Sequence, residues 1–297
     1  PANAPPPAEE PVFDRTQPLL PGDQEWLQAF RHAHLEGELR VKLAPNSSVR
    51  VMRVVDDPRS TASQLAEAIQ TEPALAAEVL RAANSALFRG RGAEAMDLQQ
   101  AVVRVGQRQL KLLLLTVMLN SQLKRGPLVD EMTRKVWRHS LVTSKLAAGL
   151  APRAGLQPEA AFMAGLFHDV GCLAILSAAQ VFQNKSALPP PTPRALLEAV
   201  VEFGYETNAT VMADWNFPED VVEAVTHFRG YVGAQHRPLA ALVALSNDLC
   251  SAWGLPVDLR RIRDLERHPA LKVLELDPEV LPSREFVERL VELAAQL

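Results

Sequence analysis

The sequence predicts an all-α fold. Hydrophobic residues make up 47% of the 297 residues, so the chain can bury a sizeable core as one large domain or as two lobes. Aromatic residues, which favour strands, account for only 5%. Alanine and leucine crowd stretches such as residues 195–201 and 238–249, and apolar residues recur with the helical period of 3.6. These three observations favour helices over a sheet.

The first half of the chain holds a tail and then a series of amphipathic segments. Residues 1–21 are rich in proline, which predicts an extended tail or linker. Ser60 or Thr61 can cap the helix that follows it, and Pro73 suits a first helical turn, where its missing N–H would have had no partner. Two glycines within residues 89–92 predict a turn. Helices are predicted over residues 23–36, 61–69, 73–83, 98–103 and 107–123.

The second half continues the helical pattern. Residues 187–193 carry four prolines, too many for a helix interior, and predict a surface loop. Helices are predicted over residues 130–150, 157–167, 168–179, 194–203, 206–215, 218–228, 237–253 and 283–297.

Charge and cysteine content limit the classes of partner. A net charge of −4 supplies no basic field for nucleic-acid phosphates or an anionic membrane, so neither is expected as a main partner. The apolar run 110–119 is about half the length that a membrane span needs. Cys172 and Cys250 belong to no CxxC pair, which argues against a structural zinc site and fits a reducing compartment. We therefore expect a cytoplasmic protein.

Two local patterns carry information about function. Within residues 72–88 the pattern predicts an amphipathic helix that ends at Asn84 and Ser85, whose short polar side chains can satisfy terminal backbone groups. In the second pattern, His168 and Asp169 are adjacent, and His139 on another predicted helix is a third potential ligand for a divalent metal that activates water. The same three residues also fit a hydrogen-bonded structural role, so their spacing alone leaves the metal open.

These patterns resemble one known family. Residues 72–88 resemble the hallmark of HDOD domains, bacterial output modules related to HD phosphohydrolases, in which an acidic-Pro-Ala-Leu start leads to a Leu-Arg-x-Ala-Asn-Ser-x-x-Phe finish. Residues 43–45, 57–58 and 98–106 resemble further HDOD elements. Residues 137–140 and 164–171 resemble the first histidine helix and the His-Asp-Ile-Gly step of HD proteins. The matching hallmark residues are Pro73, Arg81, Asn84, Ser85 and Phe88.

The resemblance implies a two-lobed helical HDOD-type fold with a degenerate HD-like lobe. Its parts would be a proline-rich tail (1–21), an N-terminal helical lobe (22–123), the HD-like lobe (124–253) and a C-terminal helical extension (254–297).

Departures from the HD pattern imply that the metal site is incomplete. Asn208 stands where active relatives commonly place a histidine, and His227 stands alone where they often have two. Asn247 takes the place of a late aspartate, unless a one-residue shift brings in Asp248. Neutral amides are poor substitutes for these ligands. The vestigial site would comprise His139, His168, Asp169, Asn208, His227, Asn247 and Asp248.

We therefore expect no catalytic residue, no cofactor and no metal, although His139, His168 and Asp169 would be the ligands if a metal were held. The resemblance implies an output or adaptor domain that binds signalling proteins such as kinases, receivers, GAF proteins or cyclic-dinucleotide enzymes. One alternative is a metal-dependent phosphohydrolase or cyclic-dinucleotide phosphodiesterase that recruits Asp248 as a ligand. Another is a nucleotide sensor without turnover, with Arg138, Lys145 or Arg229 pointing into the old pocket.

Overall fold

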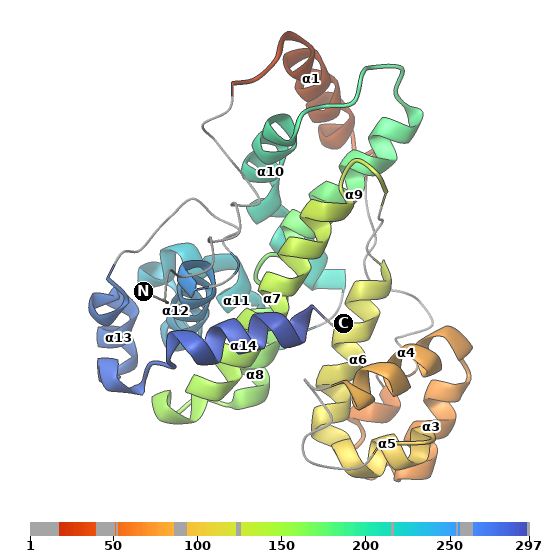
Figure 1. Ribbon diagram of the computed structural model, residues 1–297, viewed down its shortest axis with the longest axis vertical. Coiled ribbons are helices and arrows are strands. Elements are labelled where there is room, and N and C mark those ends of the chain that lie inside the picture. The colour runs from red at the N-terminus through yellow and green to blue at the C-terminus, as the bar shows by residue number, and fades with distance from the viewer. Residues whose placement is uncertain are drawn as a thin grey trace, which may run out of the picture. The chain divides into compact units, whose positions relative to one another are not determined.

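The computed structural model describes residues 18–39, 51, 53–85, 94–122, 126–214, 217–253, 255 and 264–295. These residues form α-helices joined by short 3-10 helices and loops, and none of them lies in a strand (Figure 1). The all-α prediction is therefore confirmed. The predictions for residues 1–17, 43–45, Phe88 and 89–92 lie outside the described residues.

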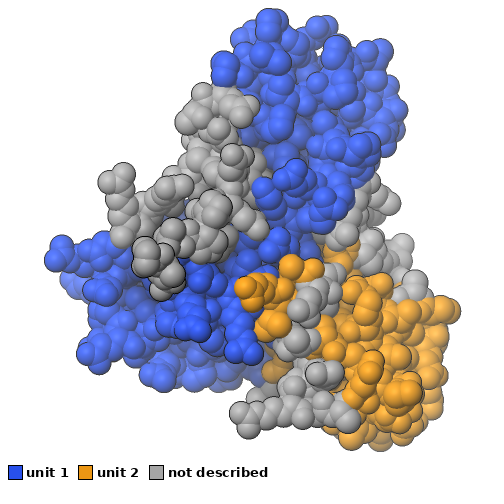
Figure 2. All heavy atoms as spheres, in the orientation of Figure 1, with its two compact units in different colours: residues 1–41, 123–291 blue, residues 42–122, 292–297 orange. Residues whose placement is uncertain are grey.

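The contacts of the chain divide it into two compact units (Figure 2). Unit 1 comprises residues 1–41 and 123–291, and unit 2 comprises residues 42–122 and 292–297. The last helix, α14 (Arg284–Ala294), has residues in both.

Unit 2 is a small helical cluster whose helix ends follow the sequence signals. The side chain of Thr61 accepts a hydrogen bond from the backbone N–H of Gln64 and caps α3, and Asp97 caps α5 in the same way. Gly106 has a φ of +78° and allows the chain to turn between two helices. The helices of unit 2 include α3 (Ala62–Gln70), α4 (Pro73–Asn84), α5 (Leu98–Val105) and α6 (Gln107–Gln122).

Unit 1 is larger and contains the His-Asp pair. In it α7 packs against α8 and α12, α8 packs against α12, and α9 packs against α10. Its α-helices are α1 (Pro21–Leu35), α7 (Asp130–Leu150), α8 (Pro158–Phe167), α9 (Val170–Lys185), α10 (Pro193–Asp214), α11 (Glu219–His227), α12 (Arg237–Trp253) and α13 (Pro269–Leu274). Its 3-10 helices are η1 (Ala151–Ala154), η2 (Phe228–Gly233), η3 (Leu265–Arg267) and η4 (Pro278–Val280).

Helix α1 belongs to unit 1, whereas the sequence analysis placed it in an N-terminal lobe of residues 22–123. Trp26 and Phe30 are fully buried and pack edge-on against Phe182 of α9. The carboxylate of Asp23 accepts hydrogen bonds from the backbone and side chain of Thr192, just before α10. This side-chain packing decides where α1 belongs, and Figure 1 shows α1 beside α10.

Helix α10 corrects one sequence prediction. Residues 194–203 and 206–215 were predicted as two helices, but Pro193–Asp214 forms one. Gly204, which lies between the two predicted helices, is helical, and the Cys172 side chain of α9 would lie 3.3 Å from a Cβ atom there. A glycine in a helix weakens it by about 0.5–1 kcal/mol, and the packing of α10 on α9 outweighs this cost.

One apolar stretch of unit 1, Pro158–Lys185, is long enough to cross a membrane by length and composition, with a mean hydropathy of 1.6. In the structure, 94% of the 18-residue window that gives this hydropathy is buried inside the protein. The stretch is divided into α8 and α9, and His168 and Asp169 lie in the turn between them. Burial in a protein core accounts for its apolar composition.

Two glycines permit close helix contacts on either side of the His-Asp pair. A Cβ atom on Gly165 would lie 2.7 Å from Cα of Ser144, so α8 can approach α7 only with glycine at this position. A Cβ atom on Gly171 would lie 1.8 Å from the carbonyl oxygen of Gly204, so α9 approaches α10 under the same constraint. The His-Asp pair is therefore held between two helix contacts that tolerate no side chain.

Gly171→Ala is expected to destabilise the protein by roughly 1–3 kcal/mol or more, because the added methyl group must push two backbones apart. Gly149→Ala is the matched control, since Gly149 is an exposed α7 position with nothing within 4 Å of the added atom. The free energy of unfolding of the control should rise by about 0.5–1 kcal/mol, because alanine favours a helix more than glycine does. Urea unfolding of both variants measures the difference, and equal stabilities would contradict the close contact.

Candidate functional site

Four side chains from three parts of unit 1 converge on one buried point. His139 lies in the middle of α7, His168 and Asp169 lie in the turn between α8 and α9, and Asn247 lies on α12. The two histidines and Asp169 are 0% exposed, and Asn247 is 7% exposed. We call these four residues the His-Asp centre.

Hydrogen bonds to backbone carbonyls determine the tautomers of both histidines. Nδ1 of His139 lies 2.8 Å from the carbonyl oxygen of Leu255, and Nδ1 of His168 lies 2.8 Å from that of Gly165. A carbonyl oxygen only accepts, so each Nδ1 carries a proton. In the neutral rings, both Nε2 atoms therefore present lone pairs.

These lone pairs face one another and two oxygen acceptors. The two Nε2 atoms are 3.3 Å apart, and Oδ1 of Asn247 lies 2.9 Å from Nε2 of His139 and 3.3 Å from Nε2 of His168. Oδ2 of Asp169 is 3.2 Å from Nε2 of His168 and 4.0 Å from Nε2 of His139. This buried carboxylate oxygen has no hydrogen bond of acceptable geometry to the described residues. The hydroxyl of Thr143, 3.4 Å from Nε2 of His139, can donate one long hydrogen bond to this group. It does not reach all four acceptors, so a cation, either a proton or a metal ion, is needed among them.

The electrostatics of the centre favour positive charge beside Asp169. Burial would raise the pKa of Asp169, but His168, His139 and Arg229 together hold this pKa far below its usual range. Burial would likewise lower the pKa of His139, yet Cys250 and Asp169 outweigh it and the pKa is raised. The centre therefore holds a carboxylate and attracts a cation.

The residues present fit one divalent cation. Ligand atoms of His139, His168 and Asp169 all lie within 4.8 Å of one another, and imidazole and carboxylate are ligands of zinc, manganese and iron. Such an ion would neutralise the facing lone pairs and, where solvent has access, would activate a bound water. The sequence predicts that no metal is held. That expectation stays a prediction, and the geometry offers a place for a single cation between two imidazole nitrogens and one carboxylate oxygen, with the amide oxygen of Asn247 as a fourth potential ligand atom.

Asn208 lies beside the centre, but its side chain is used by the backbone. Its Oδ1 accepts a hydrogen bond of 2.7 Å from the N–H of Gly171, and its Nδ2 donates to the carbonyl oxygens of His168 and Val225 at 2.9 and 3.4 Å. It therefore fixes the turn that carries the His-Asp pair, and both ends of the amide are occupied.

The other predicted site residues lie around or outside the centre. His227 is exposed, and its Nδ1 contacts the carbonyl oxygen of Glu223. Asp248 is turned away from the centre: Oδ2 pairs with His268 at 2.9 Å, and Oδ1 accepts from Nδ2 of Asn247 at 2.8 Å. The structure thus brings together His139, His168, Asp169 and Asn247, places Asn208 and Asp248 behind them, and leaves out His227.

Of the three cations named for the sensor alternative, Arg229 acts on the centre. Its charge lowers the pKa of Asp169, and its guanidinium lies 3.9 Å from the ring centre of Tyr205. Lys145 lies 5.3 Å from the ring centre of Phe162, and burial lowers its pKa to about 8. Arg138 is partly buried on α7, next to His139.

The HDOD hallmark forms a separate structural device in unit 2. The amide of Asn84 donates to the carbonyl oxygen of Ala95 at 2.9 Å and accepts from its N–H at 2.7 Å. Ser85 bonds back to Ala82, Arg81 pairs with Glu78, and Pro73 opens α4. The hallmark asparagine therefore joins the end of α4 to the segment that leads into α5.

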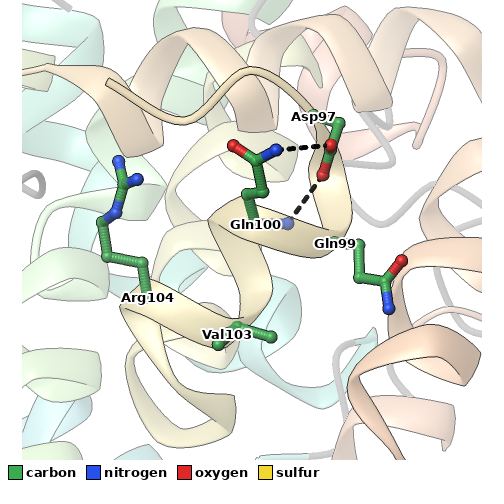
Figure 3. Close-up of a pocket in the computed structure, with 5 residues that line it drawn as sticks. All are labelled: Asp97, Gln99, Gln100, Val103 and Arg104. Atoms are coloured by element: carbon green, nitrogen blue, oxygen red, sulfur yellow. Dashed lines mark hydrogen bonds between the residues drawn. The ribbon is translucent and has the colours of Figure 1, made fainter. Parts of the chain in front are cut away.

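A shallow surface pocket also lies on α5 of unit 2 (Figure 3). Figure 3 shows Asp97 bonded to the backbone and side chain of Gln100 at its rim, with Gln99, Val103 and Arg104 completing the lining. Val103 is 67% exposed. None of the predicted site residues lines this pocket, so it adds nothing to the His-Asp centre.

Comparison with known proteins shows the family. Residues 41–230 match the HDOD domain, and the chain belongs to the HDOD domain family. It is 27% identical over 214 residues to an uncharacterized protein of Treponema pallidum (strain Nichols). That match covers 68% of this chain and 40% of the relative, so the chain spans about two fifths of the length of that protein.

Solved structures share the fold. A protein of Shewanella amazonensis SB2B named as a candidate metal-dependent phosphohydrolase matches with a TM-score of 0.68 and 25% identity, over 93% of this chain and 99% of its own. An HDOD domain protein of unknown function from Geobacter sulfurreducens matches with a TM-score of 0.68 and 21% identity, over 92% and 97%. A candidate signal transduction protein of Marinobacter aquaeolei VT8 matches with a TM-score of 0.64 and 20% identity, over 93% and 64%.

Sequence reasoning missed several contributors to the centre. The carbonyl of Leu255 orients His139, and His268 pairs with Asp248 from 20 residues further along the chain. A carbonyl has no sequence signature. The only local signal at His268 is its position before Pro269, which fits the cap of α13 and says nothing of Asp248.

Asp169→Ala is expected to lower the stability of metal-free protein by roughly 1–3 kcal/mol, because it removes the counter-charge of a buried imidazole pair. The folded pKa of Asp169 is lowered, so its contribution is present above the unfolded pKa of about 3.9 and is lost as the pH falls through the folded value. The difference in the free energy of unfolding between the unsubstituted protein and Asp169→Ala should therefore become smaller below about pH 4. Urea unfolding between pH 3 and 7 measures it, with exposed Glu206→Ala as control. A variant as stable as the unsubstituted protein would refute this role.

Asn208→Asp is expected to destabilise the protein at pH 7, because it keeps the shape but replaces two N–H donors by a carboxylate oxygen facing two carbonyl oxygens. Asn184→Asp is the matched control, since exposed Asn184 acts as an acceptor from Gln180 and keeps that role. Thermal unfolding compares them. Equal melting temperatures would show that Asn208 does not hold the turn.

Proposed function

We propose that this chain is a non-catalytic output or adaptor domain of bacterial signal transduction, located in the cytoplasm, that acts by binding other signalling proteins. The observation that carries this proposal is the enclosure of the His-Asp centre. A phosphate ester must reach a nucleophile on a metal ion, and the side chains of His139, His168 and Asp169 are at most 1% exposed.

The surroundings of the centre support the same conclusion. The ring of Phe228 packs edge-on against His168 with 5.1 Å between ring centres, and the thiol of Cys250 contacts the backbone carbonyl of His139. Asn208 stands where active relatives commonly place a histidine, and its amide is occupied by the backbone. A site for two metal ions would need further ligands, and the described residues offer one group of potential ligands, His139, His168 and Asp169.

Family membership supports a signalling role. The chain belongs to the HDOD family, and a structure with the same fold is named as a candidate signal transduction protein. Kinases, receivers, GAF proteins and cyclic-dinucleotide enzymes are the partner classes that we propose.

The enzyme alternative rests on the shared fold of the candidate phosphohydrolase from Shewanella amazonensis. It needs Asp248 as a metal ligand, and Asp248 is paired with His268. The sensor alternative needs space for a nucleotide beside Arg229, whose guanidinium lies against Tyr205.

Assays with Mn²⁺ or Mg²⁺ should detect no hydrolysis of cyclic dinucleotides or of a generic phosphate ester, because the centre is enclosed and lacks second-metal ligands. His168→Ala is the control for contaminating activity. Metal-dependent turnover that disappears in His168→Ala would overturn the proposal and establish the phosphodiesterase alternative.

Binary binding assays against kinases, receivers and GAF proteins of the source bacterium should identify a partner whose binding persists in His168→Ala, provided that this variant folds.

A further inference from the structure

A chain of hydrogen bonds leads from the His-Asp centre into the C-terminal segment. Oδ1 of Asn247 faces the centre, and Nδ2 of Asn247 donates to Oδ1 of Asp248 at 2.8 Å. Oδ2 of Asp248 lies 2.9 Å from Nε2 of His268. Nδ1 of His268 accepts a hydrogen bond of 3.1 Å from the backbone N–H of Ala270, at the start of α13. His268 is 3% exposed, so most of this series of hydrogen bonds is shielded from solvent.

The direction of every proton in this chain is determined. Because Nδ1 of His268 accepts from a backbone N–H, it carries a lone pair and the ring proton sits on Nε2. Nε2–H therefore donates to the carboxylate of Asp248, which accepts at both of its oxygens. The backbone at the start of α13 thus fixes His268, His268 fixes Asp248, and Asp248 fixes which end of the Asn247 amide it receives.

The opposite orientation of Asn247 would suit a centre without a cation. A flipped amide would place N–H donors against the lone pairs of His139 and His168. It would also place its carbonyl oxygen against the carboxylate of Asp248, at the position now 2.8 Å away. Two acceptors at that separation repel each other, and an ionised acceptor strengthens the effect. Asp248 therefore holds the amide in the orientation that only a cation in the centre can satisfy.

We infer that Asp248 and His268 are positioning residues that hold the carbonyl oxygen of Asn247 in the His-Asp centre as the fourth ligand atom for one divalent cation. The inference goes beyond the proposed binding function and does not depend on it. All three residues lie beyond the HDOD match at 41–230, so the chain completes its centre with residues from outside the matched segment.

Mn²⁺ binding measured by isothermal titration calorimetry tests this inference. Asp248→Ala should bind Mn²⁺ about 10–100-fold more weakly than the unsubstituted protein, the loss typical when a partner behind a metal ligand is removed. His268→Phe should weaken binding less, because Asp248 keeps its charge. Glu266→Ala, an exposed change in the same segment, should leave the affinity unchanged. Melting temperatures of the metal-free variants establish that each one is folded.

A rescue variant separates orientation of the amide from general damage. An aspartate has two equivalent oxygens and needs no partner to turn one of them inward. Asn247→Asp combined with Asp248→Ala should therefore recover the Mn²⁺ affinity lost in Asp248→Ala, or exceed the original value.

Three results would overturn the inference: no Mn²⁺ binding by the unsubstituted protein, equal binding by Asp248→Ala, or no recovery in the combined variant. None of these results would contradict the proposed binding function, which is tested separately by the hydrolysis and partner-binding assays.

Discussion

Two helix contacts that admit no side chain determine the arrangement of unit 1. Gly165 brings α8 against α7, and Gly171 brings α9 against α10, so the short turn between α8 and α9 has little freedom. His168 and Asp169 occupy that turn and are presented toward α7 and α12. Gly165 and Gly171 thus serve close helix packing, and this packing determines where His168 and Asp169 lie between them.

The buried polar groups of the centre then surround a position that only a cation can satisfy. Backbone carbonyls take the outer proton of each imidazole, which turns the remaining lone pairs inward toward Asn247 and Asp169. In an open site such an arrangement would activate a water molecule. Here the same groups connect α7, the α8–α9 turn and α12 within the core, so chemistry suited to hydrolysis can serve cohesion between helices.

The sequence predicted the fold better than the site. Helical periodicity, the Thr61 cap and Pro73 at a first turn are local signals, and the structure has helices where they indicate them. The break expected near Gly204 was wrong, because the need for a close contact with α9 is not visible in the sequence of α10. His139, His168 and Asp169 could be named from a motif. The pairing of Asp248 with His268 depends on tertiary packing, which no spacing rule reports.

The position of Asn247 has a consequence for how this domain is delimited. The HDOD match ends at residue 230, yet α12 and the carbonyl of Leu255 follow it, and α1 precedes residue 41 while packing on Phe182 of α9. A fragment cut at 41 and 230 would retain His139, His168 and Asp169 but lose the helix that buries them. The set of helices that encloses the centre is therefore longer than the matched segment, and a fragment meant to keep the centre intact should extend from α1 to α13.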